Sequence, residues 1–308
     1  SLVGSEMCIR DRILSMDAMA DFLRQMAKSN GIPLTHAALV LPSTEVFTRE
    51  LVMPAMTEQQ LLYNLPYEFR DYLTEEKNKY FFDYSMREVL RDESGQPTEM
   101  NLLACAALKS TVESYRAMLR RAGFRLRVLT PSECAYSAVL QAYYRRTRQE
   151  GRDLCVVNLG HSATFLYIYR GGHFASRREI EVGMSDLEHL VADQCSVDVH
   201  VAHEYVRQNY NHVLESEQAR ELYGRIAVEV VKAVNFFNYN NRERELTQLC
   251  LCGGGSAIQP LYDTIADTTG MTLHTSAELL GQRMTTEEPW MYLRAIGGVD
   301  LGIKGGLR

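Results

Sequence analysis

Two short turns contain the residues of this chain that are best suited to bind a ligand. Gly160, with the hydroxyl residues Ser162 and Thr164 close behind it, follows one strongly apolar run, and three consecutive glycines, Gly253–Gly255, follow another. Glycine has no side chain to block the approach of a ligand to the backbone N–H groups, and polyphosphates and adenosine need such close approach. The two turns therefore predict a nucleotide site.

Regular elements on either side must hold these turns in place. The apolar run Leu154–Leu159 predicts a buried strand, and Phe165–Tyr169 predicts a second strand after the first turn. Leu249–Cys252 predicts another strand, and Ile258–Thr269 has the apolar spacing of a helix. This order of elements is typical of actin-like nucleotide-binding folds. Plain tight turns, which are common after strands, are the alternative interpretation.

The composition excludes several classes of protein. At 308 residues and 46% hydrophobic content the chain is long enough for two domains with their own cores. Its net charge of -6 argues against a nucleic-acid partner. The 7 cysteines form no C-x-x-C pair and indicate small core residues of a reducing compartment. No apolar run approaches the ~18 residues of a membrane span. We expect a cytoplasmic protein without direct membrane insertion.

The first residues differ from the rest of the chain. Residues 1–12 have neither helical nor strand periodicity, and we expect them to be a foreign, unstructured segment. A helix is predicted from Ile13 to a stop at Asn30-Gly31. Residues 13–35 are therefore interpreted as the remnant of a first lobe.

Residues 36–130 have the pattern of a small α+β module. The predicted order is strand, strand, helix, strand, strand, helix, strand, with one strand at 80–84 and a polar connection at 91–98. Thr57 is the predicted N-cap of the first helix. The residues expected on one side of that helix are Leu61, Leu62, Leu65, Phe69 and Tyr72.

The remaining residues predict mainly helices. Glu217–Tyr239 is a long helix whose buried face is expected to hold Leu222, Ile226, Val230, Val234 and Phe237. A helix over Tyr292–Ile296 is expected to give way to a glycine-rich tail that starts at Gly297. The basic and aromatic stretch Tyr143–Arg148 allows a nucleic-acid interpretation, but a solvated helix end is favoured because the chain is acidic.

Histidines in one helix are the other chemical candidates. His200 and His203 could suggest a metal, yet their i, i+3 spacing differs from that of H-E-x-x-H and no third ligand is in view. A helix surface is the favoured interpretation, and no metal ligand is assigned.

Several passages together carry a resemblance to a known family. They are Leu51–Leu61, Ala106–Lys109, Ala122–Phe124, the two glycine turns and Phe236-Phe237. In these residues the chain resembles the PilM family of cytoplasmic actin-like proteins of type IV pilus assembly, and more distantly FtsA and the cytoplasmic domain of GspL. The resemblance implies an α/β, actin-like (ribonuclease H-like) two-lobed fold, with a small SHS2-like α+β subdomain inserted at 36–130 and the actin-like core with its second lobe at 131–308.

The same resemblance implies a nucleotide site for ATP and Mg²⁺. Its phosphate hairpin would include Asn158, followed by a glycine turn at Gly183, a Glu-x-x-Lys-type helix position at Glu204 and Arg207, and an adenosine turn at the triple glycine. The implied nucleotide-binding residues are Asn158, Gly160, Ser162, Thr164, Gly183, Glu204, Arg207, Gly253, Gly254 and Gly255.

Departures from the family pattern argue against hydrolysis. Asn158 stands where the family has Asp, and an amide supplies no negative charge for a Mg²⁺-bound water shell. No Asp-x-Gly turn precedes the inserted module, so the first phosphate hairpin is expected to be missing. Glu133 occupies the place of a water-orienting residue in related folds, although a surface glutamate near a helix start is favoured. No catalytic residue is assigned, and the chain is not predicted to be an enzyme.

Two functions follow from the resemblance. The favoured one is a scaffold that binds the N-terminal cytoplasmic peptide of a PilN-like inner-membrane protein and connects it to pilus motor components. The alternative is an ATP-binding, FtsA-like polymerising protein or an ATPase of the same superfamily. An FtsA-like protein needs a C-terminal amphipathic helix, and Leu301–Arg308 is short and glycine-rich for one.

Overall fold

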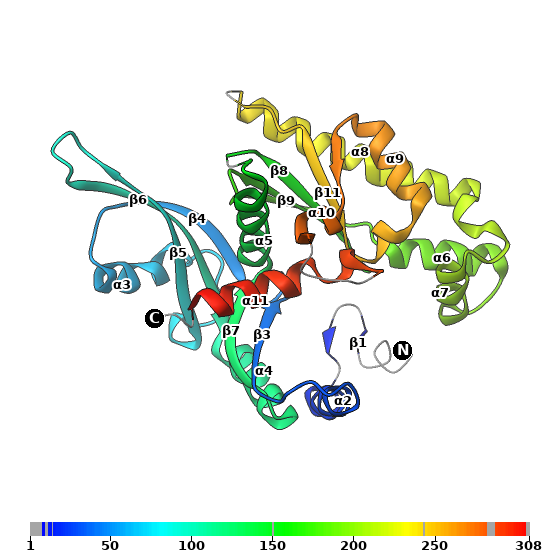
Figure 1. Cartoon of the computed structure of the whole chain (residues 1–308), viewed down its shortest axis with the longest axis horizontal. Helices are drawn as coiled ribbons and strands as arrows, with labels where there is room; N and C mark the ends of the chain where they lie inside the picture. The colour runs from blue at the N-terminus through cyan, green and yellow to red at the C-terminus, as the bar shows by residue number, and fades with distance from the viewer. Residues whose placement is uncertain are drawn as a thin grey trace. The chain divides into compact units, whose positions relative to one another are not determined.

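The chain folds into two compact units, which are described separately. The computed structural model describes residues 8–9, 12–13, 15–149, 151–242, 244–281 and 287–305 (Figure 1). Unit 1 comprises Ser1–Ala135 with Gly297–Arg308, and unit 2 comprises Tyr136–Ile296. Most of residues 1–12 lie outside the described residues; β1 (Cys8–Ile9) and β2 (Arg12–Ile13) pair antiparallel. Within the described ranges, every helix is too short or too polar to cross a bilayer.

Unit 1 contains two separate sheets besides that short pair. In one, β3 (His36–Leu41) pairs in parallel with β7 (Arg125–Pro131). The other is antiparallel in the order β4-β6-β5, with β4 (Phe47–Pro54), β5 (Tyr80–Arg91) and β6 (Pro97–Leu108). The predicted order of elements is confirmed. The three-stranded sheet belongs to residues 47–108, a narrower span than the 36–130 expected for the insertion.

Strand β5 is longer than the expected 80–84. It remains paired with β6 as far as Arg91 and Pro97, so the polar connection shrinks to a tight turn. Asp92 builds this turn, since its Oδ1 accepts hydrogen bonds from the backbone N–H groups of Ser94 and Gln96 at 2.9 Å each. Gly95 closes the turn with φ of 80°. The backbone hydrogen bonds between β5 and β6 therefore extend the two strands through polar residues from which a longer connection was expected.

Helix α3 (Glu58–Glu68) covers one face of the three-stranded sheet. Thr57 caps the helix as predicted and also forms a capping box with Gln60, whose N–H donates to Thr57 Oγ1 at 3.3 Å. The expected apolar side is only partly correct, because Leu62 and Tyr72 are 44% and 46% exposed. The buried members are Leu61, Leu65 and Phe69.

A second cluster in unit 1 packs helices against the β3–β7 pair. It includes α2 (Met16–Ser29) and α4 (Lys109–Ala122), which contribute Ala20, Tyr115, Met118 and Leu119. The helix expected from Ile13 begins at Met16 instead, because the Ser15 side chain caps it by accepting from the Ala18 N–H at 3.2 Å. Gly123 ends α4 in the left-handed region, at φ 100°.

The expected glycine-rich tail is helical instead. Helix α11 spans Leu293–Gly305 and contains four glycines. A β-carbon at Gly297 would overlap the carbonyl oxygen of Ala135, and one at Gly298 would lie 3.1 Å from Val40 Cγ2. The glycines thus let this helix approach its neighbours in unit 1, and that packing outweighs their low helix propensity.

Unit 2 is built on a five-stranded sheet in the order β10-β9-β8-β11-β12. Strands β8, β11 and β12 are parallel, and β9 and β10 continue the sheet antiparallel. The bounds are β8 Leu154–Leu159, β9 Thr164–Arg170, β10 His173–Ile180, β11 Gln248–Cys252 and β12 Thr272–His274. The strands predicted around both glycine turns are confirmed.

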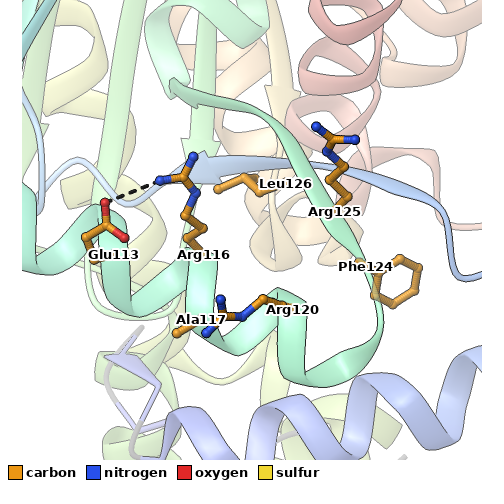
Figure 2. Close-up of a pocket in the computed structure, with 7 residues that line it drawn as sticks. All are labelled: Glu113, Arg116, Ala117, Arg120, Phe124, Arg125 and Leu126. Carbon is orange, nitrogen blue, oxygen red and sulfur yellow. Dashed lines mark hydrogen bonds and ion pairs between the residues drawn. The ribbon is translucent and has the colours of Figure 1, made fainter.

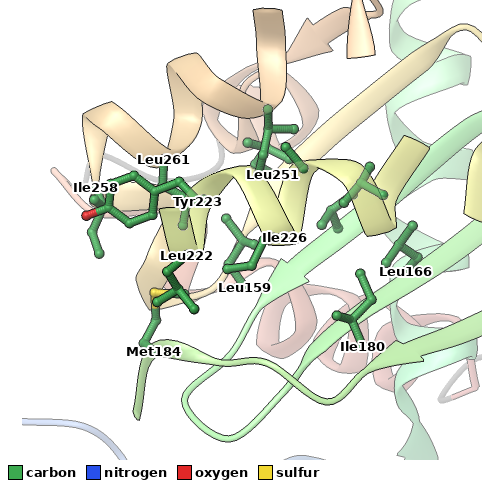
Figure 3. Close-up of a cluster of buried hydrophobic side chains, with 14 of the residues drawn as sticks. Leu159, Leu166, Ile180, Met184, Leu222, Tyr223, Ile226, Leu251, Ile258 and Leu261 are labelled. Carbon is green, nitrogen blue, oxygen red and sulfur yellow. The ribbon is translucent and has the colours of Figure 1, made fainter. Parts of the chain in front are cut away.

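The core of unit 2 lies between this sheet and its helices, as Figure 3 shows for its central side chains. The predicted stripe of α8 is confirmed, since all five of its residues are buried. The helices of this unit are α6 (Met184–Cys195), α7 (Val199–Gln208), α8 (Glu217–Asn240), α9 (Gln259–Thr269) and α10 (Ser276–Leu280), and α5 (Ser132–Thr147) leads into it from unit 1.

Candidate functional site

Three backbone segments of unit 2 meet at the predicted phosphate hairpin. The turn between β8 and β9 accepts hydrogen bonds from the start of α6, with Met184 N donating to Gly160 O at 3.0 Å and Ser185 N to His161 O at 2.8 Å. The end of β11 lies beside the end of β8, where Cys252 pairs with Asn158. The fold therefore brings the predicted hairpin and both other glycine turns together.

The glycines at this junction are needed for contacts between backbone segments. A β-carbon at Gly183 would overlap His161 O and lie 2.6 Å from Ala163 N. At Gly253, which has φ of 84°, a β-carbon would lie 2.6 Å from Leu159 O. Gly160 and Gly255 would meet Ala163 O and Met184 Sδ, each at 2.7 Å. Gly254 alone of the five candidate glycines has nothing within 4 Å of the added atom.

The donors expected to hold phosphate are partly used within the protein. The N–H of Gly160 donates to Ala163 O at 3.1 Å and lies 3.0 Å from Asn158 O. The side chain of Thr164 is fully buried, and its hydroxyl donates to Val182 O at 2.9 Å. Ser162 is exposed in the turn. Of the predicted hydroxyl donors, only Ser162 points a polar group at solvent.

Asn158 belongs to a small buried polar chain. Its side chain is 7% exposed, and its Oδ1 accepts from the Cys252 thiol at 3.9 Å. The same sulfur lies 3.5 Å from the hydroxyl of Tyr136. Burial raises the pKa of Cys252 to about 11 and that of Tyr136 well above its ordinary value. These groups are neutral at physiological pH, and a neutral amide fits among them better than a carboxylate.

Glu188 near the start of α6 is a charged residue that sequence reasoning missed. It is 8% exposed, and its Oε1 contacts His203 Nδ1 at 2.8 Å and His161 Nδ1 at 3.7 Å. His203 thus has a carboxylate partner, whereas no group of three possible metal ligands occurs in the described part of the chain. A lone glutamate on the apolar side of a helix was the signal available in the sequence.

Glu204 and Arg207 pair with one another on the surface of α7. Arg207 donates to Glu204 Oε2 from Nη2 at 2.8 Å and from Nε at 3.0 Å, which lowers the pKa of Glu204. Across the described residues no hydrogen bond or ion pair joins this couple to the glycine turns. The proposed adenosine-binding role of the two side chains stays a prediction.

One interpretation of the helix α5 region is wrong and another is incomplete. Glu133 is fully buried and accepts from the Thr48 hydroxyl at 3.0 Å, so it is not a surface glutamate. Arg145, Arg146 and Arg148 are exposed, as expected for a solvated helix end, but Tyr143 and Tyr144 are buried. Arg146 donates to the carbonyl of Glu278 at 2.6 Å, which ties this stretch to α10. In both cases the sequence did not show contacts with residues far away in the chain.

A comparison with protein-family profiles identifies the family of the chain. The profile described as "Type IV pilus assembly protein PilM" matches residues 2–287. The chain belongs to the PilM family. A solved "PilM-PilN type IV pilus biogenesis complex" is similar over 97% of this chain and 88% of that one, with a TM-score of 0.77 and 18% identity. The expected actin-like α/β fold is thereby confirmed.

Two further solved structures that resemble the chain cover less of it. The ethanolamine utilization protein EutJ from Carboxydothermus hydrogenoformans has 14% identity and a TM-score of 0.46, over 63% of this chain and 62% of that one. An archaeal actin homologue in complex with ADP has 16% identity and a TM-score of 0.43, over 59% and 58%. Among curated proteins, none matches the chain.

Proposed function

We propose that this PilM-family chain is an actin-like adaptor of the type IV pilus machinery. It binds a short N-terminal peptide of a PilN-like inner-membrane protein on the cytoplasmic side and connects that protein to the pilus motor. The observation that carries this proposal is the similarity, over nearly the whole chain, to the PilM of the solved PilM–PilN complex.

The face of the β4-β6-β5 sheet opposite α3 is the surface we assign to the peptide. Val52 on β4 is 66% exposed there and offers apolar area that a ligand can cover. Its cross-strand neighbour Asn101 has a buried Oδ1 without a hydrogen-bond partner among the described residues. An extended peptide could cover the valine and donate an N–H to this acceptor.

Charged groups frame the same face. Glu50 on β4 and Arg87 on β5 form an ion pair across the central strand, beside Leu103, which is only 6% exposed. A peptide side chain that displaced part of this ion pair would reach the apolar surface of Leu103. The face thus offers a polar acceptor at Asn101 and apolar surface at Val52 and Leu103, contacts that an extended peptide can use.

The hairpin of unit 2 supports a role that does not depend on nucleotide turnover. The Gly160 N–H and the Thr164 hydroxyl already have acceptors, and Asn158 supplies no charge for Mg²⁺. ATP and Mg²⁺ therefore remain ligands of the wider fold, one of whose members has been solved with ADP. In this chain we assign the glycine turns to packing.

Calorimetry tests the proposal with the whole chain. The peptide from the N-terminus of a PilN-like protein is titrated into the chain and into Val52→Asp, and ATP with Mg²⁺ is titrated separately. We expect peptide binding that Val52→Asp weakens about tenfold, because a charge replaces apolar contact area. The control is Val228→Asp on α8, a valine that is 45% exposed and lies in unit 2.

The outcomes separate the two functions. Peptide binding that survives in Val228→Asp and falls in Val52→Asp supports the adaptor and its docking face. Equal loss in both variants would assign the peptide to another surface. Tight ATP binding with hydrolysis, and no peptide binding, would overturn the adaptor in favour of a nucleotide-driven machine.

A further inference from the structure

A cluster of arginines stands out on the surface of unit 1 because the chain as a whole is acidic, with a net charge of -6. Tyr115, Met118 and Leu119 of α4 are buried, so Arg116 and Arg120 lie on the exposed side of this helix. On β7 the exposed positions alternate and include Arg125. Helix and strand periodicity together gather positive charge at one place.

Two of these arginines have no ion pair within the part of the chain that the structure describes. Arg116 forms an ion pair with Glu113 at 3.4 Å, and the nearby Arg121 pairs with Asp17 and Asp21 at 3.0 Å each. For Arg120 and Arg125, by contrast, no ion pair is present within residues 15–149, where this surface lies. An acidic ligand would therefore meet two guanidinium groups that need not first release a partner.

A concave pocket lies between these side chains. Figure 2 shows Arg116 and Arg120 extending from α4 and Arg125 from β7 around it. The cavity has a volume of about 230 Å³, enough for one or two side chains. Its apolar wall consists of Ala117, Phe124 and Leu126. Phe124 and Leu126 are half-buried, so a ligand can bury them further.

We propose that this pocket docks an acidic segment of a partner protein that also carries an apolar side chain. Carboxylates of the segment bind Arg120 and Arg125, whose planar guanidinium groups match a carboxylate with two parallel hydrogen bonds. The apolar side chain packs on Phe124 and Leu126. The acidic surface elsewhere repels such a segment and directs it to this site.

A protein segment fits the pocket better than a membrane surface. The cavity is recessed, and a flat layer of phosphate groups favours cations that project outward. This surface is separate from the sheet face assigned to the PilN-like peptide, and the inference does not rest on that assignment.

The test uses a fluorescein-labelled peptide of alternating acidic residues and leucines, and a matched peptide with Gln and Asn in place of the acids. Fluorescence anisotropy is measured with the whole chain and with the double variant Arg120→Glu and Arg125→Glu. We expect the acidic peptide to bind and the double variant to bind it at least about tenfold more weakly, since two attractions become repulsions. Added salt should weaken binding.

Arg225→Glu is the matched control, because Arg225 is exposed on α8 and its replacement changes the net charge in the same direction. It should bind the acidic peptide like the parent chain. Unfolding curves of both variants will check that they remain folded. If the double variant still binds the PilN-like peptide, the result separates this proposal from the adaptor function.

Three results would overturn the proposal. They are equal binding of the neutral peptide, equal binding of the acidic peptide by the double variant, and sedimentation of the chain with phosphatidylglycerol vesicles but not phosphatidylcholine vesicles in the absence of peptide binding. The last would assign the arginines to a membrane surface.

Discussion

The glycine junction of unit 2 and the α+β subdomain of unit 1 differ in what they do with their polar groups. At the junction, the turns bond to one another: Met184 N donates to Gly160 O, and the Thr164 hydroxyl donates to Val182 O. In the subdomain, Asn101 Oδ1 has no partner among the described residues, and Val52 is largely exposed. The polar groups of the junction are bonded within the protein. The subdomain leaves a hydrogen-bond acceptor and an apolar side chain that another molecule can contact.

This difference changes the meaning of a glycine turn. Close approach of a backbone is what glycine allows, and the approaching group can be a phosphate or another part of the same chain. At Gly183 and Gly253 it is the protein's own backbone. A nucleotide-type turn in the sequence is thus compatible with a purely architectural use.

The strongest test of the comparison is Gly183→Ala. The added methyl group would collide with His161 O and with Ala163 N, which both belong to the turn between β8 and β9. We expect a loss of about 3 kcal/mol in the free energy of unfolding, measured with urea. In the control Gly224→Ala the new methyl group has nothing within 4 Å, so this helical position should gain up to about 1 kcal/mol. Similar free energies of unfolding for the two variants would show that the junction accommodates the extra methyl group.

Asn158→Asp sharpens the contrast between a packed junction and a nucleotide site. Burial should hold the pKa of the new carboxyl group above its ordinary value, and ionisation should cost about 2 kcal/mol at pH 7. The unfolded chain releases this proton more readily, so the cost should grow as the pH rises from 4 to 7. Asn78→Asp, at an exposed position, should show little effect. Gain of Mg²⁺-dependent ATP binding by Asn158→Asp would instead favour a nucleotide site.

Buried thiols test both units together. Burial raises the pKa of Cys105 and Cys134 in unit 1 to about 12, and that of Cys252 in unit 2 to about 11. An unfolded thiol ionises near 9.0, so the stabilisation is complete below that pH and is lost as the pH rises toward the folded values. At pH 10 each buried thiol should lower the free energy of unfolding by about 1.4 kcal/mol. Urea unfolding at pH 8, 9 and 10 measures the slope, which Cys252→Ala should reduce; an unchanged slope contradicts the burial.

The smallest expected effects come from the two capping boxes, one in each unit. Thr57 accepts from the Gln60 N–H at 3.3 Å and Thr275 accepts from the Glu278 N–H at 3.1 Å. Thr57→Ala and Thr275→Ala should each cost about 1 kcal/mol in calorimetric unfolding. If the units unfold separately, each substitution should shift a different transition. A shift of one common transition by both would mean that the units unfold cooperatively.

Local pattern explains what could be predicted of the fold. The stripe of α8, the cap at Thr57 and the helix stop at Asn30-Gly31 each depend on residues within a few positions of one another, and all are confirmed. The errors have the opposite character. The burial of Glu133 depends on Thr48, and the helical glycines of α11 depend on Ala135 and on β3.

For the candidate site, the sequence by itself determined which turns carry glycine, which strands precede them and which family the chain resembles. Only the tertiary structure decided that Thr164 is buried, that Gly160 bonds within its own hairpin and that Arg120 and Arg125 share a pocket. Spacing along the chain encodes the period of a helix or strand and its caps. It does not encode which distant segment uses a donor or covers a side chain, because that depends on how the finished elements pack.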